Sequence, residues 1–349
     1  MFTKYYMIKK ISLKQFRCHE FLEIDVTHPF VYIDGKNGSG KTSILEALYF
    51  LSTTKSHRTS DEKEMIKKSS QFTHVKVVTD QNRYEVIQTK NGKRTLINGV
   101  EKRKLSDFIG SFKVVMFAPE DLELIKGTPA QRRNFIDLSW MQLDKIYLNN
   151  LNQYKKILKQ RNALLKKLKL DDDYVFLNIL GEQLYDVGIE IMKQRMQFIY
   201  KINHYLQDIY QLFSSHKAKI IYKPDVDEKS FKNHLEKQQK QDIIYQTTMA
   251  GPHRDDFYID FNGFDAKQYA SQGEQRLMVI AVKFALLKLI NEVTEEPVTL
   301  LLDDVLSELD LEKQTIFVNQ LPTEHQILMN SAIPLDKNGI QKIHLKKEL

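Results

Sequence analysis

Three glycines, a lysine and a hydroxyl stand within one short run, Gly35-Lys36-Asn37-Gly38-Ser39-Gly40-Lys41-Thr42. The glycines let the backbone curl so that successive N–H groups point into one concavity, a geometry that binds phosphate oxygens. The lysine can reach the terminal phosphates of a nucleotide, and the hydroxyl that follows can bind Mg²⁺. We assign Lys41 a catalytic role as well. The predicted nucleotide-binding residues are Gly35, Lys36, Asn37, Gly38, Ser39, Gly40, Lys41, Thr42 and Ser43.

The segments on either side of this run suit the same chemistry. The compact apolar segment Phe30–Ile33 predicts a buried strand before the run, and residues 41–51 predict a helix after it. A helix that begins at Lys41 directs its positive end toward a bound anion. A chance match to the motif would lack this strand and this helix, so the context favours a true phosphate-binding loop.

A second apolar segment ends in two neighbouring carboxylates. Val298–Leu302 predicts a buried strand, and Asp303 and Asp304 follow it. A nucleotide-hydrolysing site needs one acid to hold Mg²⁺, usually through water, and a second group to orient the attacking water. Adjacent side chains on a strand point in opposite directions, so the two acids take different roles. We assign Asp303, with Thr42, to the metal and Asp304 to catalysis; two solvated aspartates are the alternative.

A run with a serine and a glycine precedes an apolar helix that we expect over 275–290. The run is Ser271-Gln272-Gly273-Glu274-Gln275-Arg276, about thirty residues before Asp303. By itself it indicates only a helix capped by Ser271. In this position it resembles the signature motif of ABC-type ATPases, and Leu306–Asp310, after the acidic strand, resembles the D-loop of the same class. The resemblance implies that Ser271, Gly273 and Gln275 contact the nucleotide held by a second copy of the chain.

Two positions depart from the pattern of ABC transporters. Asn330 and Ser331 follow the expected strand Gln326–Met329, where a transporter carries a switch histidine. Glu120 and its neighbours follow the expected strand Phe112–Phe117, and no glutamine stands at the place where a transporter has one. The transporter type of switch is therefore absent or altered, which is consistent with slow hydrolysis.

Strand and helix patterns divide the chain into three stretches. Residues 1–125 and 246–349 read as strands and helices of an α/β domain. Between 126 and 245 glycine and proline are scarce, and leucines recur at helical spacing on both sides of Asp171–Asp173. We predict an ABC-type P-loop ATPase head, split in sequence by an inserted α-helical lobe with either a short hairpin or two ordinary amphipathic helices. The expected strands outside the site are 8–16, 20–26, 73–78, 83–88, 94–97, 218–222 and 257–261.

Composition sets bounds on the class of protein. The chain has 349 residues, 42% hydrophobic and 28% charged, which is typical of a folded protein of about two domains. Its 52 Lys and Arg against 45 Asp and Glu leave a net charge of +7, which permits a polyanionic partner without identifying one. One cysteine excludes a disulfide framework and a cysteine-rich zinc site. No secretory signal and no apolar run of about 18 residues is visible, so we expect a cytoplasmic protein that does not enter a membrane.

The whole chain resembles the RecF family, bacterial recombination mediators related to the SMC class. The resemblance rests on the motifs above and on the segments 16–17, 55–59, 117–122, 126–129, 132–133 and 251–256. SMC proteins insert hundreds of residues of coiled coil, whereas the insertion here is of about 120 residues. The resemblance implies ATP and Mg²⁺ as cofactors, ATP-dependent homodimerisation, and binding of gapped DNA at junctions of single and double strands. It also implies DNA repair and replication after damage, within the SOS response, with RecR and RecO as partners that help load RecA.

Candidate DNA contacts are basic residues outside the nucleotide motifs. The run 155–169 holds seven basic residues and no acid, among them Lys155, Lys156 and Lys159. A solvated helix face is the alternative reading of such a run. Lys55 and Arg58, beyond the first predicted helix, are a second candidate, and His253 with Arg254 either reach nucleotide or DNA or hold a loop. No base-reading motif is visible, so we expect binding to follow shape and charge.

Two other functions stay open at this point. One is a nucleotide-switched, SMC-like DNA clamp or adaptor of chromosome maintenance, in which hydrolysis only resets the dimer. The other is a transport-type ABC ATPase subunit, against which the missing switch histidine and the long helical insertion count.

Overall fold

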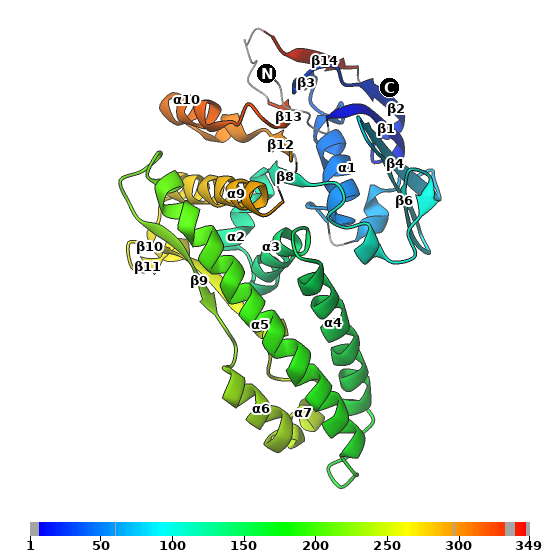
Figure 1. Ribbon diagram of the computed structural model, residues 1–349, viewed down its shortest axis with the longest axis vertical. Coiled ribbons are helices and arrows are strands. Elements are labelled where there is room, and N and C mark those ends of the chain that lie inside the picture. The colour runs from blue at the N-terminus through cyan, green and yellow to red at the C-terminus, as the bar shows by residue number, and fades with distance from the viewer. Residues whose placement is uncertain (1–6, 60, 295, 297, 332–338, 347–349) are drawn as a thin grey trace. The chain divides into compact units, whose positions relative to one another are not determined.

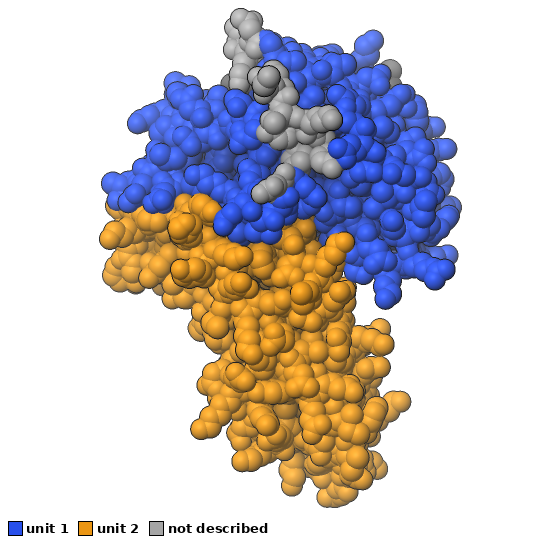
Figure 2. Space-filling view, viewed as in Figure 1, with its two compact units in different colours: residues 1–122, 208–215, 272–349 blue, residues 123–207, 216–271 orange. Residues whose placement is uncertain are grey.

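The computed structural model describes residues 7–59, 61–294, 296, 298–331 and 339–346. The chain forms two compact units, coloured separately in Figure 2. The first comprises Met1–Leu122, Asp208–Ser215 and Gln272–Leu349, and the second comprises Glu123–Gln207 and His216–Ser271. Both units are thus discontinuous in sequence. Residues 246–271, which the sequence assigned to the ATPase head, fall in the second unit.

A five-stranded parallel sheet of the first unit carries the phosphate-binding loop (Figure 1). Its order is β14-β3-β13-β12-β8, with β3 (Phe30–Gly35), β8 (Val114–Phe117), β12 (Thr299–Asp303), β13 (Gln326–Asn330) and β14 (Gln341–Leu345). Every residue of β8, β12 and β13 is buried, which explains their continuous apolar runs. β14 is not among the strands expected from the sequence, since only Ile343 and Leu345 of this short edge strand are apolar.

A six-stranded antiparallel sheet completes the strands of the first unit. Its order is β2-β1-β4-β5-β6-β7, with β1 (Ile8–Phe16), β2 (His19–Asp25), β4 (Phe72–Thr79), β5 (Arg83–Thr89), β6 (Gly92–Ile97) and β7 (Val100–Glu101). Helix α1 (Lys41–Thr53) joins the two sheets, because Leu48 shares one hydrophobic cluster with Val75 of this sheet and Leu328 of the parallel sheet. The predicted strands and the predicted helix after the loop are confirmed.

Two longer helices and four short 3₁₀ helices make up the rest of the first unit as described. These are α9 (Gln272–Thr294), α10 (Leu311–Gln320), η1 (Glu62–Met65), η2 (Leu105–Asp107), η3 (Pro119–Leu122) and η5 (Val305–Glu308). The ring of Phe284 on α9 lies 5.2 Å from Phe117 of β8 and 5.4 Å from Phe317 of α10. These aromatic contacts hold α9, which follows the signature serine, against the parallel sheet.

The second unit combines a helical hairpin with shorter helices. Its helices are α2 (Glu123–Lys126), α3 (Pro129–Met141), α4 (Lys145–Leu165), α5 (Val175–Tyr210, up to Gln207), α6 (Glu228–Lys237), α7 (Gln239–Tyr245), η4 (Pro252–Arg254) and α8 (Ala266–Tyr269). α4 and α5 flank the predicted break at Asp171–Asp173. The Asn150 amide of α4 donates to Gln194 Oε1 of α5 over 3.1 Å, and the two helices run antiparallel.

A small antiparallel sheet adds strands to this helical lobe. Its order is β11-β10-β9, with β9 (Ala218–Lys223), β10 (Asp256–Phe261) and β11 (Phe264–Asp265). The side chain of Asn203 on α5 both donates to Ile220 O and accepts from Ile220 N, each over 2.8 Å, which ties β9 to the hairpin. The segment 257–261, which the sequence placed in the head, therefore pairs inside the lobe.

Candidate nucleotide-binding site

The phosphate-binding loop connects the end of β3 to the start of α1. Gly38 and Gly40 have φ angles of 82° and 89°, in the left-handed region that favours glycine. A Cβ atom at Gly40 would lie 2.6 Å from Sγ of Cys18, in the turn between β1 and β2, and 2.3 Å from Nε2 of His19, the first residue of β2. Glycine is therefore required at position 40, where the loop touches this turn.

Two polar side chains of the loop fit a phosphate ligand. The Lys41 ammonium donates to Gly35 O over 2.6 Å and to Lys36 O over 3.3 Å, so it lies against the loop backbone. Ser39 Oγ is buried and has no hydrogen-bond partner among the residues that the structure describes. Buried hydroxyls usually have a partner, and phosphate oxygens would supply the missing acceptor. With the N-terminus of α1, these groups suit the phosphates of a nucleotide.

Thr42 and Asp303 meet across 261 residues of sequence. Thr42 Oγ1 donates to Asp303 Oδ1 over 2.9 Å, and Asn330 Nδ2 donates to the same oxygen over 2.7 Å. Burial raises the pKa of Asp303, and the hydrogen bonds from Asn330 and Thr42 offset this only in part. A bound divalent cation would favour the ionised carboxylate that burial disfavours. The structure thus brings the two predicted metal ligands together.

Asp304 leaves the strand in a left-handed conformation. Its φ angle is 51°, which non-glycine residues rarely adopt, and its backbone N–H donates to Asn330 Oδ1 over 2.9 Å. Ser331 Oγ lies 3.5 Å from Asp304 Oδ1. The strand alternation that we used to separate the two acids does not apply here, because β12 ends at Asp303. The side chains of Asp303 and Asp304 differ in direction because the chain turns after Asp303, at the left-handed Asp304.

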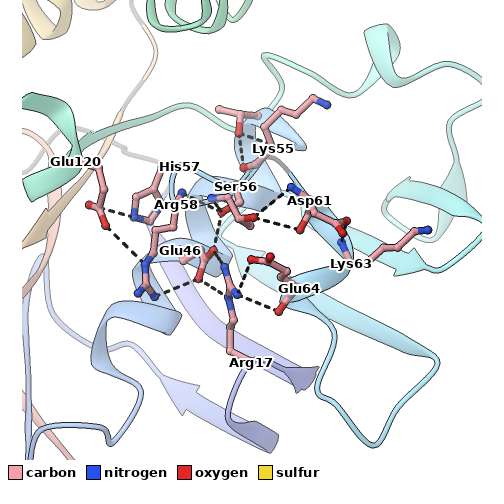
Figure 3. A network of polar contacts seen from close by, with 12 residues as sticks. Arg17, Glu46, Lys55, Ser56, His57, Arg58, Asp61, Lys63, Glu64 and Glu120 are labelled. Carbon is pink, nitrogen blue, oxygen red and sulfur yellow. Dashed lines mark hydrogen bonds and ion pairs between the residues drawn. The ribbon is translucent and has the colours of Figure 1, made fainter. Parts of the chain in front are cut away.

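A charged network surrounds Glu46 of α1 (Figure 3). Glu46 is fully buried and accepts hydrogen bonds from Arg17 Nε over 2.9 Å and from Ser56 Oγ over 2.6 Å. Burial raises the pKa of Glu46, but the hydrogen bonds from Arg17 and Ser56 outweigh it, so the net pKa is lowered. Glu46 is not among the site residues predicted from the sequence. Its signal is a lone acid among the buried apolar residues of α1.

Arg58, a predicted DNA contact, belongs to the same network. Its guanidinium lies 3.8 Å from Glu46 and 3.6 Å from Glu120, at the place where a transporter has its glutamine. Burial and the charge of Asp303 raise the pKa of Glu120, so this carboxylate lies within electrostatic reach of the acidic strand. Lys55, the neighbouring candidate, is 56% exposed and its ammonium lies 2.8 Å from Glu62. DNA contact by Lys55 or Arg58 stays a prediction.

The three signature residues differ in exposure. Ser271 and Gly273 are exposed at the start of α9, whereas Gln275 is only 3% exposed. A residue that contacts nucleotide on a second copy must be accessible in the single chain. The structure therefore leaves Ser271 and Gly273 as the accessible members of the motif and buries the side chain of Gln275.

The basic run of α4 is divided between surface and core. Lys155, Lys156 and Lys159 are exposed. Arg161, counted within the same run, is fully buried; it donates to Thr248 Oγ1 over 2.7 Å and lies 2.7 Å from Asp242. One of the seven charges thus holds the lobe together and does not contribute to a DNA-binding surface.

The segment 251–256 builds a buried polar cluster in the lobe. His253 Nδ1 lies 2.7 Å from Tyr154 Oη, and burial lowers the pKa of His253 to about 4, so its ring is neutral at pH 7. Asp255 is fully buried and accepts hydrogen bonds from Arg195 Nη1 over 2.8 Å and from Tyr222 Oη over 2.5 Å. Of the two roles left open for His253, the structure supports the loop-holding one.

Two features are absent from the part of the chain that the structure describes. No helix in those ranges is long and apolar enough to cross a membrane. No cluster of three or more His, Cys, Asp or Glu side chains is arranged there to hold a metal ion. Any Mg²⁺ at Thr42 and Asp303 would thus need further ligands from phosphates and water.

Known proteins resemble this chain over nearly its whole length. The family model described as RecF/RecN/SMC N terminal domain matches residues 7–334. The DNA replication and repair protein RecF of Acholeplasma laidlawii is 52% identical over 342 residues, which cover 98% of each chain. The protein of the same name from Agathobacter rectalis is 39% identical over 330 residues, 92% of this chain and 91% of the relative.

Solved structures agree with these matches. The chain described as the recombination mediator protein RecF-ATP in the RecFOR pathway is 31% identical, with a TM-score of 0.91 over 97% of this chain and 96% of that one. An Smc head domain from Pyrococcus furiosus, at 18% identity and a TM-score of 0.52, shares the fold alone. The predicted α/β ABC-type head with an inserted helical lobe is confirmed. The chain belongs to the RecF family of DNA replication and repair proteins.

Proposed function

We propose that this chain is a recombination mediator that binds ATP with Mg²⁺ and dimerises on gapped DNA. The observation that carries the proposal is the meeting of Thr42 and Asp303 beside the phosphate-binding loop, because it joins a loop and an acidic strand that are distant in sequence. The similar structure described as RecF-ATP supports ATP as the nucleotide. The pathway in that description, RecFOR, supports RecR and RecO as partners in loading RecA.

The geometry suggests how hydrolysis to ADP and phosphate would proceed. Backbone N–H groups of Gly35–Ser43 and the Lys41 ammonium would bind the phosphates. Thr42 and Asp303 would hold Mg²⁺, which neutralises charge on the phosphate oxygens when bound. Asp304 would orient the attacking water. Asn330 in place of a switch histidine supports slow hydrolysis, which we expect DNA to stimulate.

Dimerisation would place Ser271 and Gly273 of one copy against the ATP of the other. Both residues are exposed in the single chain, which supports this role. The hydroxyl of Ser271 and the amide of Gly273 would add hydrogen bonds to the terminal phosphate, so ATP would stabilise the dimer more than ADP does.

Replacing Ser271 with arginine is expected to block ATP-dependent dimerisation while ATP still binds the monomer, since the bulky side chain would fill the space of the phosphate. Sedimentation velocity with ATP measures dimerisation, and titration of a fluorescent ATP analogue measures binding. Gln272→Arg, at the adjacent exposed position, adds the same charge and should retain dimerisation. Undiminished ATP-dependent dimerisation of the Ser271 variant would contradict the assignment, whereas loss of both dimerisation and ATP binding would indicate that the chain is misfolded.

The exposed lysines of α4 are proposed to contact DNA phosphates. Replacing Lys155, Lys156 and Lys159 with alanine is expected to weaken DNA binding and to flatten its salt dependence by about 0.9 in log–log slope for each true contact. Fluorescence anisotropy at several salt concentrations measures both. Lys229, Lys232 and Lys237 of α6, replaced together, are the control, because they remove the same charge from another exposed helix face. Equal effects of the two triple variants would indicate that α4 is an ordinary solvated surface.

A further inference from the structure

Asn330 lies at the end of β13, directly opposite Asp303 in the register of the parallel sheet. Asn330 is 2% exposed, and both the nitrogen and the oxygen of its side-chain amide make hydrogen bonds. Nδ2 donates to Asp303 Oδ1 over 2.7 Å, and Oδ1 accepts the backbone N–H of Asp304 over 2.9 Å. One side chain therefore contacts both acidic residues of the site.

The first contact fixes the carboxylate of Asp303. Asp303 Oδ1 accepts from both Asn330 and Thr42, whereas no hydrogen bond within the described part of the chain ends on Oδ2. Two donors on one oxygen hold the carboxylate in one rotamer and leave the second oxygen for another ligand. Partners that orient a metal-binding carboxylate in this way are known to tune metal affinity.

The second contact fixes the backbone of Asp304. Its left-handed φ of 51° is held by a shared hydrogen bond, because the Asp304 N–H also lies 3.2 Å from Asn330 O. Non-glycine residues keep this conformation only where their surroundings impose it. The adjoining segment is held as well, since Tyr32 Oη donates to Ser331 O over 3.2 Å. Without the Asn330 side chain, the backbone of Asp304 would lose the hydrogen bond from its N–H to Asn330 Oδ1, which helps to hold its left-handed conformation.

We propose that Asn330 is a positioning residue for ATP hydrolysis, which directs Asp303 toward Mg²⁺ and Asp304 toward the water. The inference rests on the proposed function, and it assigns Asn330 no contact with the phosphates. One amide group links Asp303, which would bind the metal, to Asp304, which would orient the water. A shift of either residue would therefore change the position of the other.

The test measures how ATP affinity depends on Mg²⁺ in Asn330→Ala and in wild type. We expect the Mg²⁺ concentration for half-maximal ATP binding to rise about 10-fold or more in the variant. ATP affinity measured in EDTA should stay within about twofold, because the phosphate-binding loop is unchanged. If Asn330→Ala does not fold, Asn330→Ser leaves a hydroxyl in the same space, and we expect the same direction of change.

Gln326→Ala is the matched control. Gln326 is a buried amide at the other end of β13, where it accepts from Ile8 N over 2.7 Å and donates to Ile8 O over 3.1 Å. This variant should lower the melting temperature without changing the Mg²⁺ dependence. If Asn330→Ala also changes only the melting temperature, the inference is overturned and Asn330 is a structural amide. If wild type binds ATP with no Mg²⁺ dependence at all, the proposed metal site fails, and the inference fails with it.

Discussion

Replacing Lys41 with alanine is expected to weaken ATP binding by about 10- to 100-fold, since a hydrogen bond to a charged group contributes about 1.5–3 kcal/mol. The ammonium now donates to two carbonyl oxygens of its own loop, Gly35 O and Lys36 O. It therefore lies where the phosphates would meet the loop, and it can exchange these carbonyls for phosphate oxygens. Titration of a fluorescent ATP analogue measures the change.

Lys36→Ala is the control for this prediction. Lys36 is an exposed lysine of the same loop, and its replacement removes the same formal charge as Lys41→Ala. Its predicted contribution to phosphate binding comes from its backbone N–H, which the substitution keeps. Its ATP affinity should stay within about threefold of wild type, since exposed charges contribute little. Undiminished ATP binding by Lys41→Ala would defeat the assignment of the phosphate-binding loop.

Replacing Asp304 with asparagine is expected to lower the rate of ATP hydrolysis by about 10²- to 10⁴-fold, the range for loss of a positioned general base. ATP binding should be retained, because Thr42 and Asp303 are unchanged. The variant should therefore accumulate as an ATP-bound dimer on DNA. Phosphate release measures hydrolysis, and the lifetime of the DNA complex measures trapping.

Asp227→Asn provides the control for Asp304→Asn. Asp227 caps α6 by accepting from Ser230 N over 2.8 Å, and asparagine caps a helix about as well, so this variant should leave both stability and hydrolysis unchanged. Near-normal hydrolysis by Asp304→Asn would remove Asp304 from the catalytic role. If the trapped dimer supports repair fully in cells, turnover only resets the dimer, and the rival clamp or adaptor function gains support.

The phosphate-binding loop and the acidic strand could be predicted because their information is local. Gly35–Thr42 stands between a strand and a helix that its neighbours specify, and Val298–Leu302 is apolar because β12 is buried on both faces. The contact between Thr42 and Asp303 was expected only because both residues would serve one metal ion. A contact between residues 261 positions apart has no local signal in the sequence.

The features that the sequence analysis missed depend on tertiary packing. Arg161 falls both in the basic run 155–169 and at a position of the apolar stripe, and only the packing of α4 shows that it contacts Asp242 inside the lobe. The strand at 256–261 has the pattern of any half-buried strand, and only pairing with β9 assigns it to the second unit. Glu46 stands alone among the apolar residues of α1, and Asn330 stands out only as the residue in place of a switch histidine. The roles of both emerge only from their hydrogen-bond partners.

The central claim is that ATP drives two copies of this chain together on DNA. Sedimentation velocity of the wild-type chain with ATP, with ADP and without nucleotide, each with and without a gapped duplex, tests it most directly. We predict a monomer without nucleotide and with ADP, a dimer with ATP, and a larger dimer fraction when the gapped duplex is present. The same sedimentation coefficient in all nucleotide states, or a dimer that forms without nucleotide, would contradict the account.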